Sequence, residues 1–348
     1  MPARSMGHTI EGAAFRRGGG YLRGRRPPRG EFGTAEQDAM RRDFTINGLF
    51  EVPSDGRVID FVGGVEDLRA RRLRAIGRAE DRLGEDRLRM LRAARFAARF
   101  DLEVDSEVET AIRLHANDLL GVSRGRVGTE VRRILLHPSR GRGVALIEAL
   151  GVGPSVLRES PLPLTDQRIA RLPPMCDLAA GLAAWMLDRS GASTGCSPDR
   201  QAQWGAALVL SNAEAEALSV TLELASFIRS GWEDADLAPR KRAAARSAFH
   251  SALDLIRAED PVRAELVATE VERLAAEGLA PAPLVTGDDL IALGWAPGPA
   301  FKRVLSDLYD RQLRGEFSSR SAAIAAAHEV HSADRSADPS PEDGTGTT

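Results

Sequence analysis

Apolar and polar residues alternate along residues 8–16 and again along residues 44–52, which predicts two short β-strands with one buried face each. A third apolar run, over residues 58–64, stops at a pair of glycines, as a strand does before a turn. From about residue 66 the spacing of the apolar positions becomes helical. Residues 84–100 combine strong helix formers with acids in the first turn. The pattern therefore predicts a small strand-containing region followed by helices.

Two further signals indicate where helices begin and end. Residues 106–109 read Ser-Glu-Val-Glu, the pattern of a capping box at the start of a helix. One face of that helix should contain Val108, Ile112, His115 and Leu119. Pro138 and Ser139 predict the start of another helix, which Gly151 should end.

The composition changes repeatedly after this point. Residues 152–175 are rich in proline and predict an irregular crossing, whereas residues 176–278 predict several helices rich in alanine and leucine. Residues 279–330 form a separate helical segment. Residues 331–348 are rich in Ser, Asp, Pro and Gly, and we expect a disordered tail there.

The charge of the chain is distributed unevenly. The 348 residues allow two or three domains, and their net charge is only −3. Residues 1–150 nevertheless have an excess of arginines over acids, and the remainder has an excess of acids. This asymmetry predicts that the first part binds a polyanion. The preference for Arg over Lys suits phosphate binding, but GC-rich coding explains it equally well.

Other features of the composition bear on location. No run approaches the roughly 20 apolar residues of a membrane span, and no apolar signal-peptide core follows Met1. Cys176 and Cys196 lack the spacing of a metal site or a disulfide framework. We therefore expect a cytoplasmic protein without a membrane partner. Its oligomeric state is left open.

A basic pair and a carboxylate precede the second predicted strand. Arg41, Arg42 and Asp43 stand directly before its alternating residues. Guanidinium groups at the end of a strand suit a phosphorylated ligand. A charged loop before an edge strand is an equally good interpretation of this motif alone.

The strongest polar motif is Glu85-Asp86-x-x-Arg89-x-x-Arg92. On a continuous helix Asp86, Arg89 and Arg92 would share one face. An adjacent carboxylate and guanidinium offer an acceptor beside a donor, which matches the Watson–Crick edges of adenine and cytosine and mismatches guanine and uracil. Intrahelical ion pairing on a solvated face is the alternative, and it accounts for most isolated motifs of this kind.

Several segments in order resemble one known family. YLRGRRPPRGEFGTAEQDAMRRDFTINGLF is followed by IDFVGGVEDLRARRLRAIG, EDRLRMLRAARFAARF and SRGRVGTEVRRIL. Over roughly residues 8–135 they resemble bacterial tRNA CCA-adding nucleotidyltransferases and poly(A) polymerases. Residues 279–315 also resemble the tail of CCA-adding enzymes. The resemblance implies template-independent addition of C and A, from CTP and ATP, to the 3′ ends of tRNA.

The resemblance also implies roles for individual residues. The nucleotide-binding set would be Arg41, Arg42, Asp43, Asn47, Glu85, Asp86, Arg89 and Arg92. In that set Asp86 and Arg89 would read the base, and Arg92 would lie near the phosphates. The RNA-binding set would be Arg95, Arg126, Lys302 and Arg303.

The family holds Mg²⁺ on an Asp-x-Asp pair that precedes these motifs. Only a few residues stand before the family-like IEGAAFR segment, so we expect that pair to be missing. Glu11 is a weak candidate for an acidic residue beside the metals, and no complete catalytic or metal set is predicted. Asp234 and Asp236 form an Asp-x-Asp far downstream, where a solvated loop is the better interpretation.

The expected fold is mostly α. An incomplete small nucleotidyltransferase β head (1–60) should lead into a helical neck (61–150), body (151–278) and tail (279–330). We expect nucleotide recognition to be retained without efficient transfer. A start codon placed too late and a true truncation both explain this, and the well-kept motifs favour the first. The alternative functions are a poly(A) polymerase and a non-catalytic RNA-binding remnant.

Overall fold

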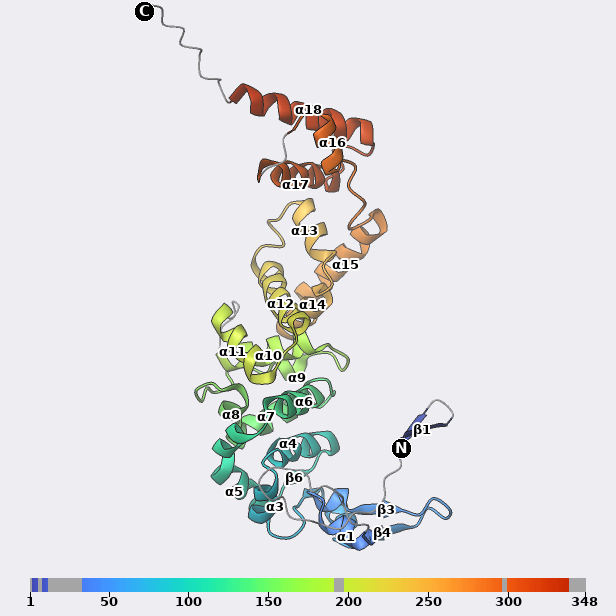
Figure 1. Ribbon diagram of the computed structural model, residues 1–348, viewed down its shortest axis with the longest axis vertical. Coiled ribbons are helices and arrows are strands. Elements are labelled where there is room, and N and C mark those ends of the chain that lie inside the picture. The colour runs from blue at the N-terminus through green and yellow to red at the C-terminus, as the bar shows by residue number, and fades with distance from the viewer. Residues whose placement is uncertain (1, 6–7, 12–32, 191–196, 296–298, 338–348) are drawn as a thin grey trace, which may run out of the picture. The chain divides into compact units, whose positions relative to one another are not determined.

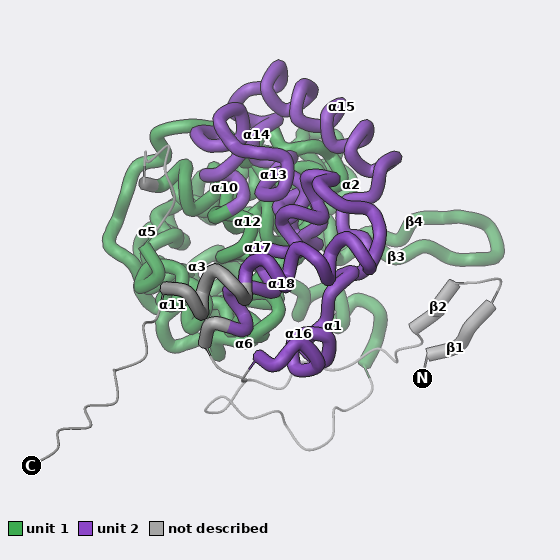
Figure 2. The backbone as a smooth tube through the Cα atoms, turned by 90° about the horizontal axis from the view of Figure 1, so that it is seen from above, with its two compact units in different colours: residues 1–223 green, residues 224–348 purple. Residues whose placement is uncertain are grey.

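A computed structural model of the chain describes its helices and short strands (Figure 1). It describes residues 2–5, 8–11, 33–190, 197–295 and 299–337. The chain divides into two compact units, residues 1–223 and 224–348 (Figure 2). Helices predominate after a strand-containing start, which confirms the predicted fold class. The division into head, neck, body and tail stays a prediction.

The strands of the described residues form three separate pairs. β1 (Pro2–Ser5) pairs antiparallel with β2 (His8–Glu11), β3 (Leu49–Glu51) antiparallel with β4 (Val58–Asp60), and β5 (Arg72–Leu73) parallel with β6 (Glu103–Val104). The strands predicted over residues 8–16 and 58–64 are therefore present in their first part. Residues 12–32 lie outside the described residues.

The strand predicted over residues 44–52 is wrong in its first half. A 3₁₀ turn, η1 (Thr45–Asn47), replaces it, and extended backbone begins only at Leu49. The Thr45 N–H donates to the carbonyl of Arg74 at 3.0 Å, and the Thr45 hydroxyl donates to the buried Asp67 at 2.7 Å. A Cβ on Gly64 would lie 2.3 Å from the Thr45 carbonyl oxygen, so only glycine fits there.

Helices make up most of the first unit. They are α1 (Ala35–Met40), α2 (Gly64–Arg69), α3 (Ala79–Glu85), α4 (Arg89–Phe100), α5 (Ser106–His115), η2 (Ala116–Gly121), α6 (Arg124–Leu135), α7 (Arg140–Ala149), α8 (Gly153–Leu157), α9 (Arg168–Arg171), α10 (Leu178–Ser190) and α11 (Pro198–Leu208). α12 (Asn212–Ser230) crosses into the second unit. The central helix α4 packs against α6 and α7. Its apolar side chains are buried except that of Phe100, whereas Arg89, Arg92, Arg95 and Arg99 recur every three or four residues along one face.

Two predicted helix starts differ from the structure. Residues 84–100 do not form one helix, because the backbone is extended at Asp86, between α3 and α4. The Asp86 carboxylate accepts the N–H of Leu88 at 3.1 Å, a local bond that competes with helical backbone. α5 is capped by Asp105, whose side chain accepts the Glu107 N–H, and not by the predicted box on Ser106. His115, predicted to be a core residue, is half-buried and hydrogen-bonded to Asp118.

The second unit is helical in its described residues. It contains α13 (Leu237–Ala244), α14 (Phe249–Glu259), α15 (Pro261–Glu277), α16 (Gly287–Ala292), α17 (Pro299–Leu313) and α18 (Arg320–Ala337). Helices α16 to α18 share a small core around Leu290, Leu308 and Ala323. α18 continues past residue 331, where the sequence predicted a disordered tail; residues 338–348 lie outside the described part. The predicted irregular crossing over residues 152–175 also contains the short helices α8 and α9.

Candidate functional site

The polar residues predicted from both motifs line one pocket of about 470 Å³ in the first unit. It lies between the turn that follows α1, the start of α4 and the exposed side of α6. Its lining comprises Arg42, Asp43, Asn47, Asp86, Leu88, Arg89, Arg92, Phe96, Arg126, Glu130 and Arg133. Segments about 80 residues apart in sequence, residues 42–47 and 126–133, thus meet at α4.

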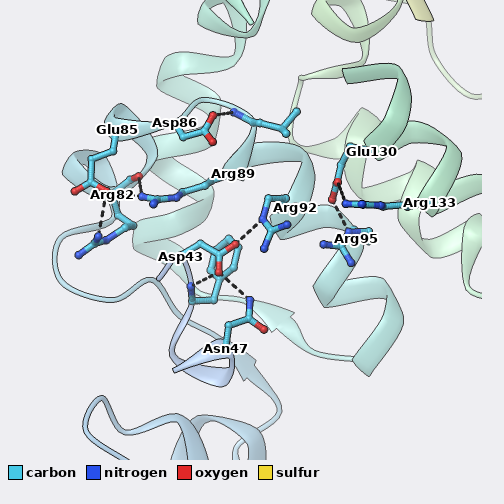
Figure 3. A network of polar contacts seen from close by, with 12 residues as sticks. Asp43, Asn47, Arg82, Glu85, Asp86, Arg89, Arg92, Arg95, Glu130 and Arg133 are labelled. Carbon is cyan, nitrogen blue, oxygen red and sulfur yellow. Dashed lines mark hydrogen bonds and ion pairs between the residues drawn. The ribbon is translucent and has the colours of Figure 1, made fainter. Parts of the chain in front are cut away.

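Asp43 is the buried anchor of this pocket. Its carboxylate accepts from Arg92 Nε at 2.6 Å, from Asn47 Nδ2 at 2.8 Å and from the Phe44 N–H at 3.0 Å (Figure 3). Burial alone would raise the pKa of Asp43, but the charge of Arg92 and these hydrogen bonds outweigh it and lower the pKa. Asp43, ionised at neutral pH, therefore fixes the position of Arg92. Among the described residues the two Nη atoms of Arg92 have no hydrogen-bond partner.

The basic pair beside Asp43 is held by another buried carboxylate, Asp38 in α1. Arg42 donates to Asp38 through Nε and Nη2, at 3.0 and 2.9 Å, and to the Asn47 carbonyl at 2.5 Å. Arg41 also bonds to Asp38, through Nε at 2.8 Å. Only Arg42 of the pair lines the pocket in the part of the chain that the structure describes.

The base-reading residues predicted from the sequence both line the pocket, but they are not paired with each other. Asp86 lies before α4, so the predicted shared helix face is wrong for this residue. Its Oδ2 accepts from Arg126 at 2.6 Å, whereas Arg89 in α4 donates to Glu85 at 2.6 Å and to the Arg82 carbonyl at 2.6 Å. The acceptor and the donor are therefore each held by a separate partner.

A buried glutamate supports the far wall of the pocket. Glu130 in α6 is 2% exposed, and it accepts from Arg95 in α4 and from Arg133 at 3.3 Å (Figure 3). Arg95, a predicted RNA-binding residue, is mostly buried and also stacks on Phe96, 4.1 Å from the ring centre.

Sequence reasoning missed Glu130 and Arg82. Glu130 occupies a position between Val127, Val131 and Ile134, which are all buried. A single acidic residue on an apolar helix face is the sequence feature that could have identified Glu130 as a buried, paired carboxylate. Arg82 in α3 is positioned by the carbonyls of Ile76 and Met40, at 2.9 and 2.8 Å, which no local pattern predicts.

Three further predicted residues are not among those that line this pocket. The backbone of Glu11 is in β2, and its side chain is outside the described part. Lys302 and Arg303 are exposed on α17, in the second unit.

The described residues offer no group of three or more His, Cys, Asp or Glu side chains that could hold a metal ion. Asp236 of the downstream Asp-x-Asp caps α13 and pairs with Arg314 at 2.9 Å. Among the described helices, none is long and apolar enough to cross a membrane.

Comparisons with known proteins cover different parts of the chain. Residues 3–74 match the poly A polymerase head domain. A CCA-adding enzyme of Streptococcus pyogenes serotype M5 (strain Manfredo) is 38% identical over 144 residues, which are 41% of this chain and 36% of the relative. The matched region thus spans about a third of that relative's length.

Solved structures are similar over most of the chain. The CCA-adding enzyme of Bacillus stearothermophilus in complex with CTP has a TM-score of 0.80 at 21% identity, with 97% of this chain and 82% of that chain covered. The CCA-adding enzyme of Thermotoga maritima complexed with tRNA(CCA) has a TM-score of 0.60 at 18% identity, with 85% and 74% covered. At these identities the likeness establishes a shared fold.

Proposed function

Because the chain belongs to the family of CCA-adding nucleotidyltransferases and poly(A) polymerases, we propose that its pocket binds CTP and ATP for addition to tRNA 3′ ends in the cytoplasm. One observation carries the proposal. The ion pair of Asp43 and Arg92 stands in the same pocket as Asp86 and Arg89, although the four residues come from three segments.

The base would meet Asp86 and Arg89. Adenine and cytosine each present an amino donor beside a ring-nitrogen acceptor, so a carboxylate and a guanidinium complement both. Guanine and uracil present a carbonyl where the carboxylate stands, and two acceptors would then face each other. A carboxylate has about four acceptor positions, so Asp86 can keep its bond to Leu88 while it accepts from a base.

The triphosphate would meet the guanidinium groups of Arg42 and Arg92. Planar guanidinium groups bind phosphate oxygens through two parallel N–H donors. Arg92 donates to Asp43 through Nε, so its Nη atoms can donate to the ligand. Because Asp43 and Asp38 already hold these arginines, little side-chain entropy is lost when a nucleotide binds.

Nucleotide transfer in this family uses Mg²⁺, which when bound activates the attacking oxygen and neutralises the leaving phosphate. The described residues do not fit such a site. Asp43 and Asp86 are each paired with an arginine, and no group of three ligands converges in the part of the chain that the structure describes. We therefore assign to these residues the binding and orientation of nucleotide and RNA, and derive no transfer step from them.

The proposal is tested with the purified chain and a tRNA that ends before its CCA. We expect the tRNA to bind, and CTP and ATP to bind more tightly than GTP or UTP. If nucleotides are added, growth that stops after C, C and A supports CCA addition. A long tail made from ATP alone would identify a poly(A) polymerase, against the CCA-adding names of the matched relatives. Absence of any preference among the four nucleotides would contradict the proposal.

A further inference from the structure

A second pocket, of about 400 Å³, lies on α4 beside the first and shares Arg133 with it. The last turn of α4 contributes Arg99, and the turn that leads from α6 into α7 contributes His137 and Ser139. Ala98 and Ile134 supply a small apolar floor. Arg133 thus stands on the border between the two pockets.

The second pocket is electropositive. Among the described residues, none of its lining side chains is acidic, and Arg99 is exposed without an ion-pair partner. Arg140, which directly follows the lining residue Ser139, is 1% exposed and donates to the carbonyls of Leu135, Pro173 and Pro174, at 2.7, 2.8 and 2.6 Å. No carboxylate takes part in those bonds, so the charge of Arg140 adds to the field.

Two further features bear on the charge of this pocket. Burial and the charges of Arg99 and Arg140 together lower the pKa of His137. Glu130, which lines the first pocket, accepts from both Arg95 and Arg133 and so offsets only one of their two charges. The second pocket thus keeps a net positive charge close to an apolar floor, a combination that suits a phosphate attached to a ribose.

We propose that this second pocket binds a backbone phosphodiester of the RNA strand whose 3′ end enters the first pocket. The inference rests on the proposed function, because a nucleotide in the first pocket requires an RNA end beside it. Arg133 borders both pockets, so ligands that fill them would be neighbours. Arg99 is the recognition residue, because within the described residues its guanidinium makes no ion pair and lies only over the ring of Phe100.

The experiment compares Arg99→Gln with Arg69→Gln in the full chain. Arg69 is also an exposed arginine without an ion pair among the described residues, but it lies on α2 and lines neither pocket. Both variants lose one surface charge, and circular dichroism checks that both stay folded. Binding of a fluorescent tRNA that lacks its CCA is measured between about 50 and 200 mM salt, because affinity that depends on phosphate contacts falls steeply over this range. CTP binding is measured in parallel.

We expect Arg99→Gln to weaken tRNA binding about threefold to tenfold and to reduce the slope of log affinity against log salt by about 0.7, the value for one phosphate contact on a single strand. CTP binding should stay unchanged. Equal behaviour of Arg99→Gln and Arg69→Gln would overturn the inference while leaving the proposed function intact. Weaker CTP binding in Arg99→Gln would also overturn it, since the pocket would then serve the nucleotide. If the unmodified chain bound neither CTP nor tRNA, the proposed function would fail first.

Discussion

The two ends of the arginine face of α4 are held in different ways. At the first pocket Arg89 is paired with Glu85 and Arg92 with Asp43, both at 2.6 Å. At the second pocket Arg99 has no carboxylate partner among the described residues. The neighbouring Arg140 donates to three backbone carbonyls and, within the described residues, to no carboxylate. Arginines on or beside α4 are therefore paired with a carboxylate at the first pocket, whereas Arg99 and Arg140 at the second are not.

The difference separates two kinds of recognition. A paired guanidinium is fixed in orientation, so it can contribute to a hydrogen-bond pattern that distinguishes one ligand from another. Much of its charge is already offset, which weakens long-range attraction. An unpaired guanidinium keeps its charge and its freedom, and it attracts phosphates in a salt-dependent way. We infer that the first pocket selects a nucleotide, whereas the second holds an RNA strand of any sequence.

The largest effect should come from Asp43→Ala, which converts the paired end into an unpaired one. Arg92, Asn47 and the Phe44 N–H would lose their shared acceptor. We expect the free energy of unfolding to fall by about 3 kcal/mol and CTP affinity to fall about a hundredfold. Urea denaturation and CTP titration measure the two effects.

Asp55→Ala is the matched control for this variant. Asp55 is 54% exposed and lies 3.7 Å from Arg57 in the turn between β3 and β4. Its loss should cost less than about 0.5 kcal/mol. Equal losses of stability in the two variants would show that the buried Asp43–Arg92 pair stabilises the fold no more than an exposed pair does.

The next largest effect should come from Glu130→Gln. The amide removes the charge that offsets Arg95 and Arg133, but it keeps the shape of the side chain. We expect the free energy of unfolding to fall by about 2 kcal/mol and the salt dependence of tRNA binding to become steeper. Glu109→Gln, at a half-exposed pair with Arg113, serves as the control. An unchanged salt dependence would mean that Glu130 does not limit the charge of the second pocket.

The sequence predicted most of the first pocket and little of the second. Asp43, Asp86, Arg89 and Arg92 were identified because their motifs are local and ordered. The second pocket depends on Arg140, whose bonds to Pro173 and Pro174 join segments more than 30 residues apart. No spacing within one segment predicts such a contact.

The errors in the fold have a related cause. The strand predicted from residue 44 fails because Thr45 bonds to Asp67 and Arg74, which belong to distant segments. The break at Asp86 was missed for a different reason. Helix propensity favours residues 84–100 throughout, but the local bond from the Leu88 N–H to the Asp86 carboxylate competes with helical backbone at this point.

A smaller effect, on selectivity, is expected from Asp86→Asn. The amide can present an N–H donor to the base where the carboxylate accepts, so the preference for CTP over UTP should fall about tenfold. Asp118→Asn is a suitable control, because Asp118 is about half exposed and pairs with Arg87 outside the lining of the first pocket. A preserved preference in Asp86→Asn would remove Asp86 from base reading.

The smallest effect concerns pH. The pKa of Asp43 is below the ordinary value of 3.8, because the charge of Arg92 and three hydrogen bonds outweigh burial, which acts in the opposite direction. A carboxylate with a lowered pKa stabilises the fold above its unfolded pKa and loses that contribution as pH falls through its folded pKa. The stability difference between the native chain and Asp43→Asn should therefore be constant above about pH 5 and narrow below pH 3.8. Denaturation midpoints across this range measure it, and a difference that grows on acidification would contradict the assignment.

The most direct measurement is equilibrium titration of the full chain with CTP, ATP, GTP and UTP under identical salt conditions. Asp86 offers an acceptor and Arg89 a donor, which complement the bases of CTP and ATP but not those of GTP and UTP. CTP and ATP should therefore bind at least about tenfold more tightly than GTP and UTP. Equal affinities for all four nucleotides would show that the first pocket recognises only the triphosphate, and would contradict its assignment as a reader of the base.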